Sequence, residues 1–134
     1  MEILIDTQVL IWFQLDHRNL GKIAKKLLID RNNTIYVSDI SLYEIAIKQT
    51  IGKLANFDID IQDIITIGKD DGFNFITLDH GAIAAYISIP VHSEHRDPFD
   101  RLIIATAKKN GLTLLSADEK FELYKDYISL IKLR

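Results

Sequence analysis

Four carboxylates in this chain occupy positions from which they could bind a divalent cation together. They are Asp6, Glu44, Asp100 and Asp118. Three of them come directly or soon after short apolar runs at residues 3–5, 35–37 and 112–115, which have the composition of buried strands. Like charges repel, so a shared acidic cluster requires a counter-charge, and a divalent cation most often supplies it. The pattern indicates metal-dependent phosphodiester chemistry, with RNA as the favoured substrate.

Oxygen ligands of this kind suit Mg²⁺ or Mn²⁺, which keep several waters and accept phosphate oxygens. Such an ion polarises a phosphoryl oxygen and lowers the pKa of a coordinated water, so a metal-activated water can hydrolyse the diester. We assign Asp6 and Asp100 as the main metal ligands. Asp118 is assigned to a second ion or an ordered water, and Glu44 to ligation through water or to orienting the attacking hydroxide. All four are candidate catalytic residues.

Each of these acids also has a structural explanation at the start of a helix, as a cap or, for Asp100, in the first turn. Asp6 and Asp118 could each accept a backbone N–H at the start of a helix. Ser41 and Glu44 fit a capping box, in which Glu44 bonds back to the Ser41 amide. A helix dipole stabilises such an acid by only about 0.3–1 kcal/mol, which repulsion within one cleft could cancel. The helix-cap explanation therefore leaves the clustering itself unexplained.

Other polar residues lie beside the acids. Thr7 and Ser116 could hydrogen-bond a ligand water, although bonding to the nearby backbone is the commoner role. His92 and His95 fall in a polar loop, where histidines are more often at the surface. Because the chain has no cysteine, a zinc site is not expected.

Strands and helices alternate along the chain. Strands are expected at residues 3–5, 35–37, 73–78, 112–115 and 129–133. Helices are expected over residues 23–30, 41–48, 79–86, 98–109 and 119–123. Two more are expected, one that begins at about residue 7 and one that begins at 58 or 60 and ends before 68 or 71. The first helix carries Trp12 and Phe13, which are expected in the core rather than as a platform for base stacking. Asp97 is expected to cap the helix that begins at Pro98, with Asp100 in its first turn.

This alternation predicts an α/β fold in which helices cover both faces of a parallel sheet. Right-handed crossovers place the carboxyl ends of the strands along one edge. Ligands of open parallel sheets bind at that edge, where the strand order reverses. The four acids are expected there.

The composition fits a single domain over residues 1–134. The chain is 48% hydrophobic and 26% charged, which is enough to bury a core. The absence of cysteine excludes disulfides and fits the cytoplasm. No signal peptide and no membrane span are expected, because no long apolar run occurs. The net charge of −3 counts mildly against nucleic-acid binding, although a basic rim including Lys48 and Lys53 could offset it locally.

Several sequence blocks resemble the PIN-domain ribonucleases, and in particular the VapC-type toxins of bacterial toxin–antitoxin pairs. The blocks are Leu4-Ile5-Asp6-Thr7-Gln8-Val9-Leu10-Ile11-Trp12, Val37-Ser38, Ser41-Leu42-Tyr43-Glu44-Ile45-Ala46-Ile47-Lys48, Ile51-Gly52-Lys53-Leu54, His95-Arg96-Asp97-Pro98-Phe99-Asp100-Arg101-Leu102-Ile103-Ile104-Ala105 and Leu114-Leu115-Ser116-Ala117-Asp118. Their order and spacing fit the family from the first strand to the last.

The resemblance implies a PIN-like three-layer α/β/α fold with a central parallel five-stranded sheet. It also implies Mg²⁺- or Mn²⁺-dependent cleavage of single-stranded RNA, often tRNA, that leaves a 3′-hydroxyl and a 5′-phosphate. The family's acidic quartet maps onto the four acids, and Asp97 is an extra acid that could assist. A homodimer is implied, as is a cognate antitoxin that blocks the site, often with a basic side chain. Gln8 stands where close relatives often carry His or Asn, which bears on substrate choice.

Two other functions stay open beside an endoribonuclease toxin. A Mg²⁺-dependent phosphatase would use Asp6 as its nucleophile. Such enzymes usually carry a second Asp two residues later, where this chain has Gln8. The other is a non-catalytic module that binds RNA or a protein partner, and the intact set of acids argues against it.

Overall fold

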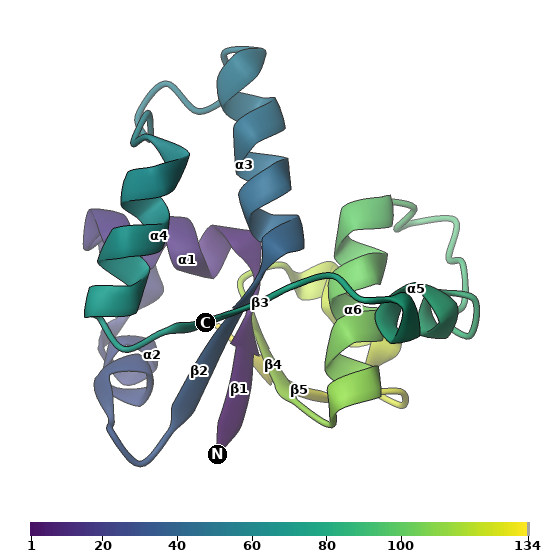
Figure 1. Cartoon of the computed structure of the whole chain (residues 1–134). Helices are drawn as coiled ribbons and strands as arrows, with labels where there is room; N and C mark the ends of the chain where they lie inside the picture. Colours follow the sequence, from purple (N-terminus) through teal and green to yellow (C-terminus); the bar gives the residue numbers. More distant parts are fainter. Residues whose placement is uncertain (134) are drawn as a thin grey trace.

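The computed structural model describes residues 1–133, and a five-stranded sheet forms its centre. The strands are β1 (Glu2–Ile5), β2 (Thr34–Ser38), β3 (Asn74–Ile76), β4 (Thr113–Ser116) and β5 (Ser129–Lys132). They lie in the order β3-β2-β1-β4-β5, and every neighbouring pair is parallel (Figure 1). The predicted parallel five-stranded sheet is confirmed.

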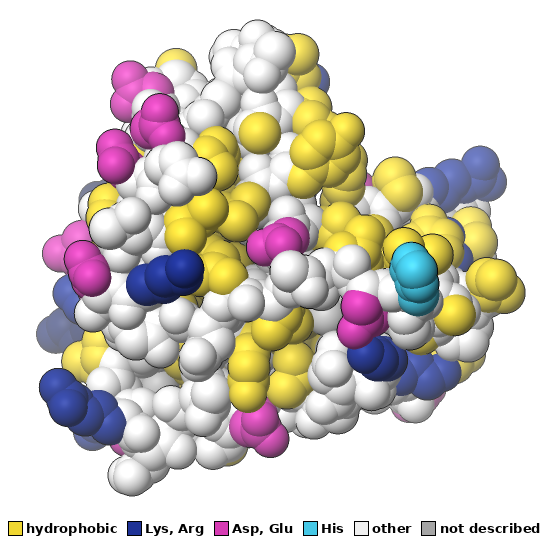
Figure 2. Space-filling model, in the orientation of Figure 1, with side chains coloured by type: hydrophobic (Ala, Val, Ile, Leu, Met, Phe, Trp, Pro, Cys, Tyr) yellow, Lys and Arg dark blue, Asp and Glu magenta, His cyan; other side chains and the backbone are white. Residues whose placement is uncertain are grey.

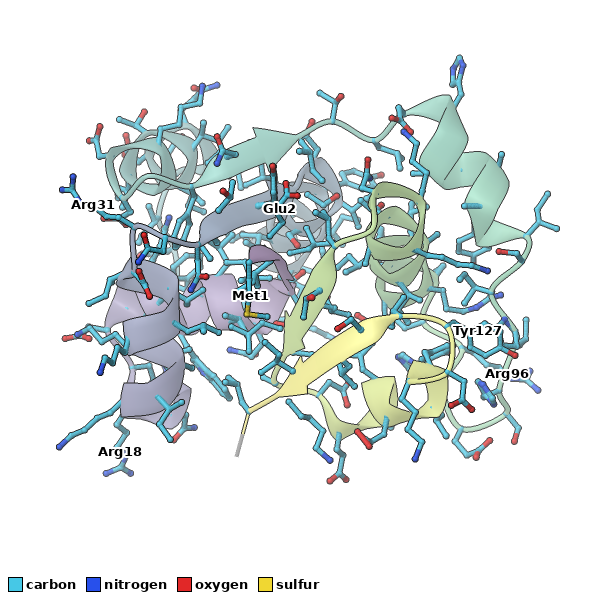
Figure 3. The ribbon with its side chains drawn as sticks, turned by 90° about the horizontal axis from the view of Figure 1, so that it is seen from below. Met1, Glu2, Arg18, Arg31, Arg96 and Tyr127 are labelled. Carbon is cyan, nitrogen blue, oxygen red and sulfur yellow. The ribbon has the colours of Figure 1, made fainter. Side chains whose placement is uncertain are left out.

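Helices cover both faces of this sheet. They are α1 (Thr7–Leu15), α2 (Lys22–Ile29), α3 (Asp39–Thr50), α4 (Ile61–Asp70), α5 (His80–Tyr86) and α6 (Pro98–Asn110), with the 3₁₀ helices η1 (Arg18–Leu20) and η2 (Glu119–Tyr124). Seen from below, the strands lie between two helical layers, with Arg18 and Arg31 on one side and Arg96 and Tyr127 on the other (Figure 3). This is the predicted α/β/α arrangement. No helix within residues 1–133 has the length and apolar character needed to cross a membrane.

The central strand β1 contributes to two hydrophobic cores, because successive residues of a strand point to opposite faces. Ile3 and Ile5 pack in the core beneath α1 and α2. Leu4 packs in the opposite core with Ile103 and Ile104 of α6. All of these side chains are fully buried. Each contributes about 1.5–3 kcal/mol to stability, so the acid that comes after β1 stands on a rigid support.

The strand order reverses beside β1. From β1 the chain builds β2 and β3 on one side, and then returns to the other side of β1 to build β4 and β5. The Asp6 N–H extends the β1–β4 pairing by donating to the Leu115 carbonyl over 3.1 Å. The residues directly after β1 and β4 therefore meet at the topological switch point, where open parallel sheets bind ligands.

Helix α3 begins earlier than predicted. Ser38 is its N-cap, because the Ser38 hydroxyl accepts a hydrogen bond from the Ile40 N–H over 3.1 Å. Ser41, the predicted first residue, lies inside the helix and is fully buried. The predicted capping box of Ser41 and Glu44 is therefore wrong, and the Glu44 side chain is free to find other partners. Helix α3 rises from the carboxyl edge of the sheet and contacts both α1 and α6 (Figure 1).

Candidate active site

All four predicted acids line one cleft at the carboxyl edge of the sheet. The cleft has a volume of about 600 Å³. Its acidic lining comes from four different places in the fold: Asp6 after β1, Glu44 in α3, Asp100 in α6 and Asp118 after β4. Thr7 and Asp97, predicted as supporting residues, also line it. The third supporting residue, Ser116, is fully buried and contacts the cleft through Asp6.

Asp6 is held firmly at the end of β1. Its Oδ1 accepts a hydrogen bond from the Val9 N–H over 2.8 Å, so Asp6 caps α1 as the structural explanation expected. Its Oδ2 accepts from the Ser116 hydroxyl over 2.6 Å and from the Ala117 N–H over 3.0 Å. Burial nevertheless raises the pKa of Asp6. Because each carboxylate oxygen has two lone pairs, Oδ1 keeps capacity for a further partner.

Glu44 reaches the cleft from α3 and is buried. The Thr7 hydroxyl donates to Glu44 Oε1 over 2.7 Å, and it lies 3.0 Å from the Ser41 hydroxyl. Lys48, one turn later on α3, places its Nζ 2.9 Å from Glu44 Oε2. Glu44 is therefore oriented by α1 and neutralised by a lysine that itself lines the cleft.

Asp100 is paired with a buried histidine. His95 Nε2 lies 2.8 Å from Asp100 Oδ2, and His95 Nδ1 lies 3.1 Å from the Tyr124 hydroxyl. An ionised carboxylate only accepts, so the hydrogen bond to Asp100 is donated by His95 Nε2–H. The Tyr124 hydroxyl also lies 3.4 Å from the His95 carbonyl oxygen, to which it donates. Burial raises the pKa of Asp100 to about 6, against the His95 hydrogen bond and with the added repulsion of Asp97 and Glu44. The prediction that His95 lies at the surface is wrong, because only 4% of it is exposed.

Two further helices begin at the cleft. Asp97 caps α6 by accepting from the Phe99 N–H over 2.8 Å, and Asp118 caps η2 by accepting from the Lys120 N–H over 2.9 Å. The helix-cap explanation is thus correct for both, as it is for Asp6. The N-terminal end of a helix carries partial positive charge, which stabilises acids there. Capping and clustering therefore occur together in the same residues.

The donor atoms of the cleft fit a divalent cation that prefers oxygen. Ligand atoms of His95, Asp100 and Asp118 all lie within 4.8 Å of one another. Among residues 1–133, no lysine or arginine forms a salt bridge with Asp6, Asp100 or Asp118. Because the His95 Nε2–H is engaged by Asp100, the carboxylates offer the free lone pairs. Such a donor set fits Mg²⁺ or Mn²⁺ better than zinc.

Two side chains bond to the acids of this cleft in ways that the sequence analysis did not predict. Lys48 was expected only in a basic rim, and its ion pair with Glu44 could have been predicted, because a spacing of four residues is that of a helical ion pair. His95 belongs to one of the family-like blocks, but its local sequence indicates a surface loop. It is buried by its contact with Tyr124, which is 29 residues away along the chain. Its function in the site is therefore visible only after folding.

Both aromatic residues of α1 are half-buried and pack against the core, and Trp12 also lines the cleft. Phe13 packs against Phe73 with ring centroids 5.0 Å apart, as expected of a core residue. Trp12 is only half-buried, and it lines the acidic cleft. The expectation of a wholly structural Trp12 is therefore incomplete.

The chain matches one family model and several solved structures. The family model described as the PIN domain matches residues 3–126. Among solved structures, the chain is similar to VapBC2 from Rickettsia felis bound to a DNA fragment from their promoter, with a TM-score of 0.72, 19% identity and 100% of each chain covered. The chain is also similar to VapBC-5 from Mycobacterium tuberculosis, a member of the VapBC family of toxin-antitoxin systems. The TM-score is 0.65 and the identity 15%, and the match covers 99% of this chain and 98% of that one. For FitAcB from Neisseria gonorrhoeae the TM-score is 0.61 and the identity 21%, and the match covers 96% of each chain. A comparison with curated proteins found no match.

Proposed function

The chain belongs to the PIN-domain family, and from this premise we propose that it is a metal-dependent endoribonuclease, the toxin of a toxin–antitoxin pair. The observation that carries the proposal is the gathering of Asp6, Glu44, Asp100 and Asp118 in one cleft at the switch point of the sheet. The similarity to VapBC complexes supports the toxin assignment. Cleavage would give a 5′-phosphate and a 3′-hydroxyl.

Each acid has a proposed role that is consistent with its contacts. Asp6 and Asp100 would hold the metal ion, Mg²⁺ or Mn²⁺, and Asp118 would hold a second ion or an ordered water. When bound, the metal polarises a phosphoryl oxygen and lowers the pKa of a water. Glu44, already fixed by Thr7 and Lys48, orients the attacking water by accepting its hydrogen bond.

Supporting roles are proposed for the three neighbours of the acids. Ser116 fixes the Asp6 carboxylate through its 2.6 Å hydrogen bond. Thr7 fixes Glu44 in the same way from α1. Asp97, exposed at the start of α6, repels the ionised Asp100 carboxylate, and a bound cation would relieve this repulsion.

The proposed nuclease activity is tested with purified protein and a single-stranded RNA of mixed sequence. We expect cutting in Mg²⁺ or Mn²⁺, no cutting in EDTA, and recovery when excess metal is restored. End analysis of the products should find 5′-phosphates. If the protein cuts equally well in EDTA, the metal-dependent mechanism fails, and a phosphorylated Asp6 trapped with a phosphatase substrate would favour the phosphatase.

A cognate antitoxin and a second copy of the chain are the proposed protein partners. The similar VapBC and FitAcB structures support the antitoxin, and a small reading frame beside the gene would identify it. Exposed apolar side chains over α3 and around α5 support a homodimer (Figure 2). These are Tyr43, Ile83, Ile87 and Val91.

The dimer has a matched pair of variants. Ile87, just after α5, and Ile23, on α2 at the other face of the sheet, are both 87% exposed. We expect Ile87→Lys to halve the molar mass measured by light scattering at micromolar concentration, because a charge would be buried at the interface. Ile23→Lys should leave the mass unchanged. A monomeric wild-type protein would contradict the dimer.

A further inference from the structure

A second hollow opens directly beside the acidic cleft, with a volume of about 220 Å³. The two hollows share four lining residues: Gln8, Ile11, Trp12 and Leu54. The second is completed by Leu15, His17, Lys53, Ala55, Asn56 and Phe57, and we call it the Trp12 groove. Because the hollows share this wall, a chain molecule that lies across the acids can extend into the neighbouring groove.

The far wall of the Trp12 groove is preformed. The chain leaves α3 through Gly52, whose φ of 73° suits glycine. Gln49 then donates from its side-chain amide to the carbonyl oxygens of Phe57 over 3.1 Å and Ile59 over 2.8 Å. The Phe57 side chain is 2% exposed and anchors the segment in the core. A ligand that enters the groove therefore meets a wall that needs no ordering on binding.

The groove combines an aromatic surface with a cation and two amides. The half-buried Trp12 ring stacks on His17, with centroids 5.7 Å apart and planes inclined by 20°. Lys53, Gln8 and Asn56 are exposed along the groove. Aromatic surfaces with nearby cations are how proteins bind single-stranded nucleic acids, since bases stack on the rings and phosphates meet the cations. Amide groups can in addition hydrogen-bond the edges of a base.

We propose that the Trp12 groove binds an unpaired nucleobase of the RNA, beside the phosphodiester held at the acids. The inference rests on the proposed ribonuclease function. Bases inside a duplex stay stacked on their neighbours, so the groove selects single-stranded or looped RNA. Lys48 in the cleft and Lys53 in the groove offset the repulsion between the acids and the RNA backbone. An apolar peptide of a protein partner would leave Lys53 and the two amides unused.

Trp12 is the only tryptophan in the chain, so its fluorescence reports on the groove directly. The probe is a short single-stranded RNA, titrated in Mg²⁺ into the Asp100→Asn variant so that the RNA stays intact. We expect the RNA to quench Trp12 fluorescence as it binds, and the same sequence as a blunt duplex to leave it unchanged. Moving a single abasic nucleotide along the RNA should abolish quenching at one position only.

Variants test the same contact by fluorescence anisotropy of labelled RNA. Trp12→Leu should weaken binding roughly 5- to 100-fold, the range expected for loss of one stacked base. Trp12→Phe should keep most of the affinity, because a ring remains. Lys53→Ala, a surface change that leaves the core intact, should weaken binding several-fold and reduce its salt dependence. The matched control is Tyr127→Leu, an exposed aromatic change on the other side of the sheet (Figure 3).

The outcomes separate this inference from the proposed function. Quenching by single-stranded RNA together with the loss in Trp12→Leu supports it. RNA that is bound and cut by the wild type with unchanged Trp12 fluorescence overturns the nucleobase site and leaves the nuclease intact. Trp12→Leu that binds RNA normally but fails to bind a protein partner overturns it also, and assigns the groove to that partner. If the wild type neither binds nor cuts RNA, both the inference and the proposed function are wrong.

Discussion

Asp100→Asn is expected to remove most RNA cleavage while making the metal-free protein more stable. The ionised carboxylate supplies a ligand charge that the amide lacks, and metal stabilisation of a phosphoryl transition state is worth several kcal/mol. We therefore expect the rate to fall about 1000-fold. Asp6→Asn should act in the same way. Asn caps a helix as well as Asp does, so the Asp6 variant keeps the cap of α1.

The gain in stability comes from removal of a buried charge. The pKa of Asp100 rises from 3.8 to about 6 on folding, mainly because of burial. Between these values the folded protein binds more protons than the unfolded chain, so the stability of the metal-free wild type falls as the pH rises. Above about pH 6 the cost is fully present and reaches up to about 3 kcal/mol. His95, Asp97 and Glu44 face the carboxylate and share in this coupling.

Urea unfolding in EDTA at about pH 5 and about pH 7 measures the effect. The wild type should be less stable at the higher pH, and Asp100→Asn should lose much of this difference and be the more stable protein at pH 7. The control is Asp60→Asn, a cap of α4 outside the cleft, which should cut RNA normally. Wild-type cleavage by Asp6→Asn or Asp100→Asn would remove that residue from the catalytic site.

Two substitutions of His95 should separate its two hydrogen bonds. The amide of Gln extends about as far as Nε2 and can still donate to Asp100, whereas the shorter Asn reaches only as far as Nδ1, toward Tyr124. Residues that orient metal ligands typically contribute 10- to 100-fold to metal affinity or activity. We therefore expect His95→Asn to lose about 10- to 100-fold in Mn²⁺ affinity and in cleavage. His95→Gln should keep most of both.

Calorimetric Mn²⁺ titration gives a measurement that does not depend on turnover. Thermal unfolding of both variants shows whether the ring's packing in the core has been replaced. If His95 has only a structural role, both variants should be less stable than the wild type but should bind Mn²⁺ with equal affinity. Equal Mn²⁺ affinities in His95→Asn and His95→Gln would therefore contradict a role in orienting Asp100.

Local sequence was enough to predict the sheet and the edge at which the acids meet. Short apolar runs mark buried parallel strands, and crossovers of one hand bring the carboxyl ends of all these strands to the same edge. Asp6 and Asp118 could be placed there because Asp6 comes directly after such a strand and Asp118 comes soon after one. Their helix caps were also predictable, since a cap depends on neighbours two or three residues away. The PIN-domain family could be identified from the same blocks.

The predicted start of α3 was wrong because two serines, Ser38 and Ser41, could each cap the helix. Ser38 and Ser41 both precede helix-forming residues, and the sequence cannot weigh them. The sheet decides between them. Ser38 pairs with Ile76 as the last residue of β2, so the helix begins at once. Glu44 then faces Thr7 across the cleft instead of capping its own helix.

Tertiary structure alone decided which charges are buried and what they touch. His95 is buried because Tyr124 and Asp100 enclose it, and Trp12 reaches a groove because the segment after α3 stands opposite. The raised pKa of Asp100 has the same origin, since burial raises it while Glu44 of α3, Asp97 and His95 act on it from different parts of the chain. Hydrophobic periodicity and helix capping depend on residues that are neighbours in the sequence. The burial of a side chain and the electrostatic potential around it depend on many residues that are distant in the sequence and come together only when the chain folds.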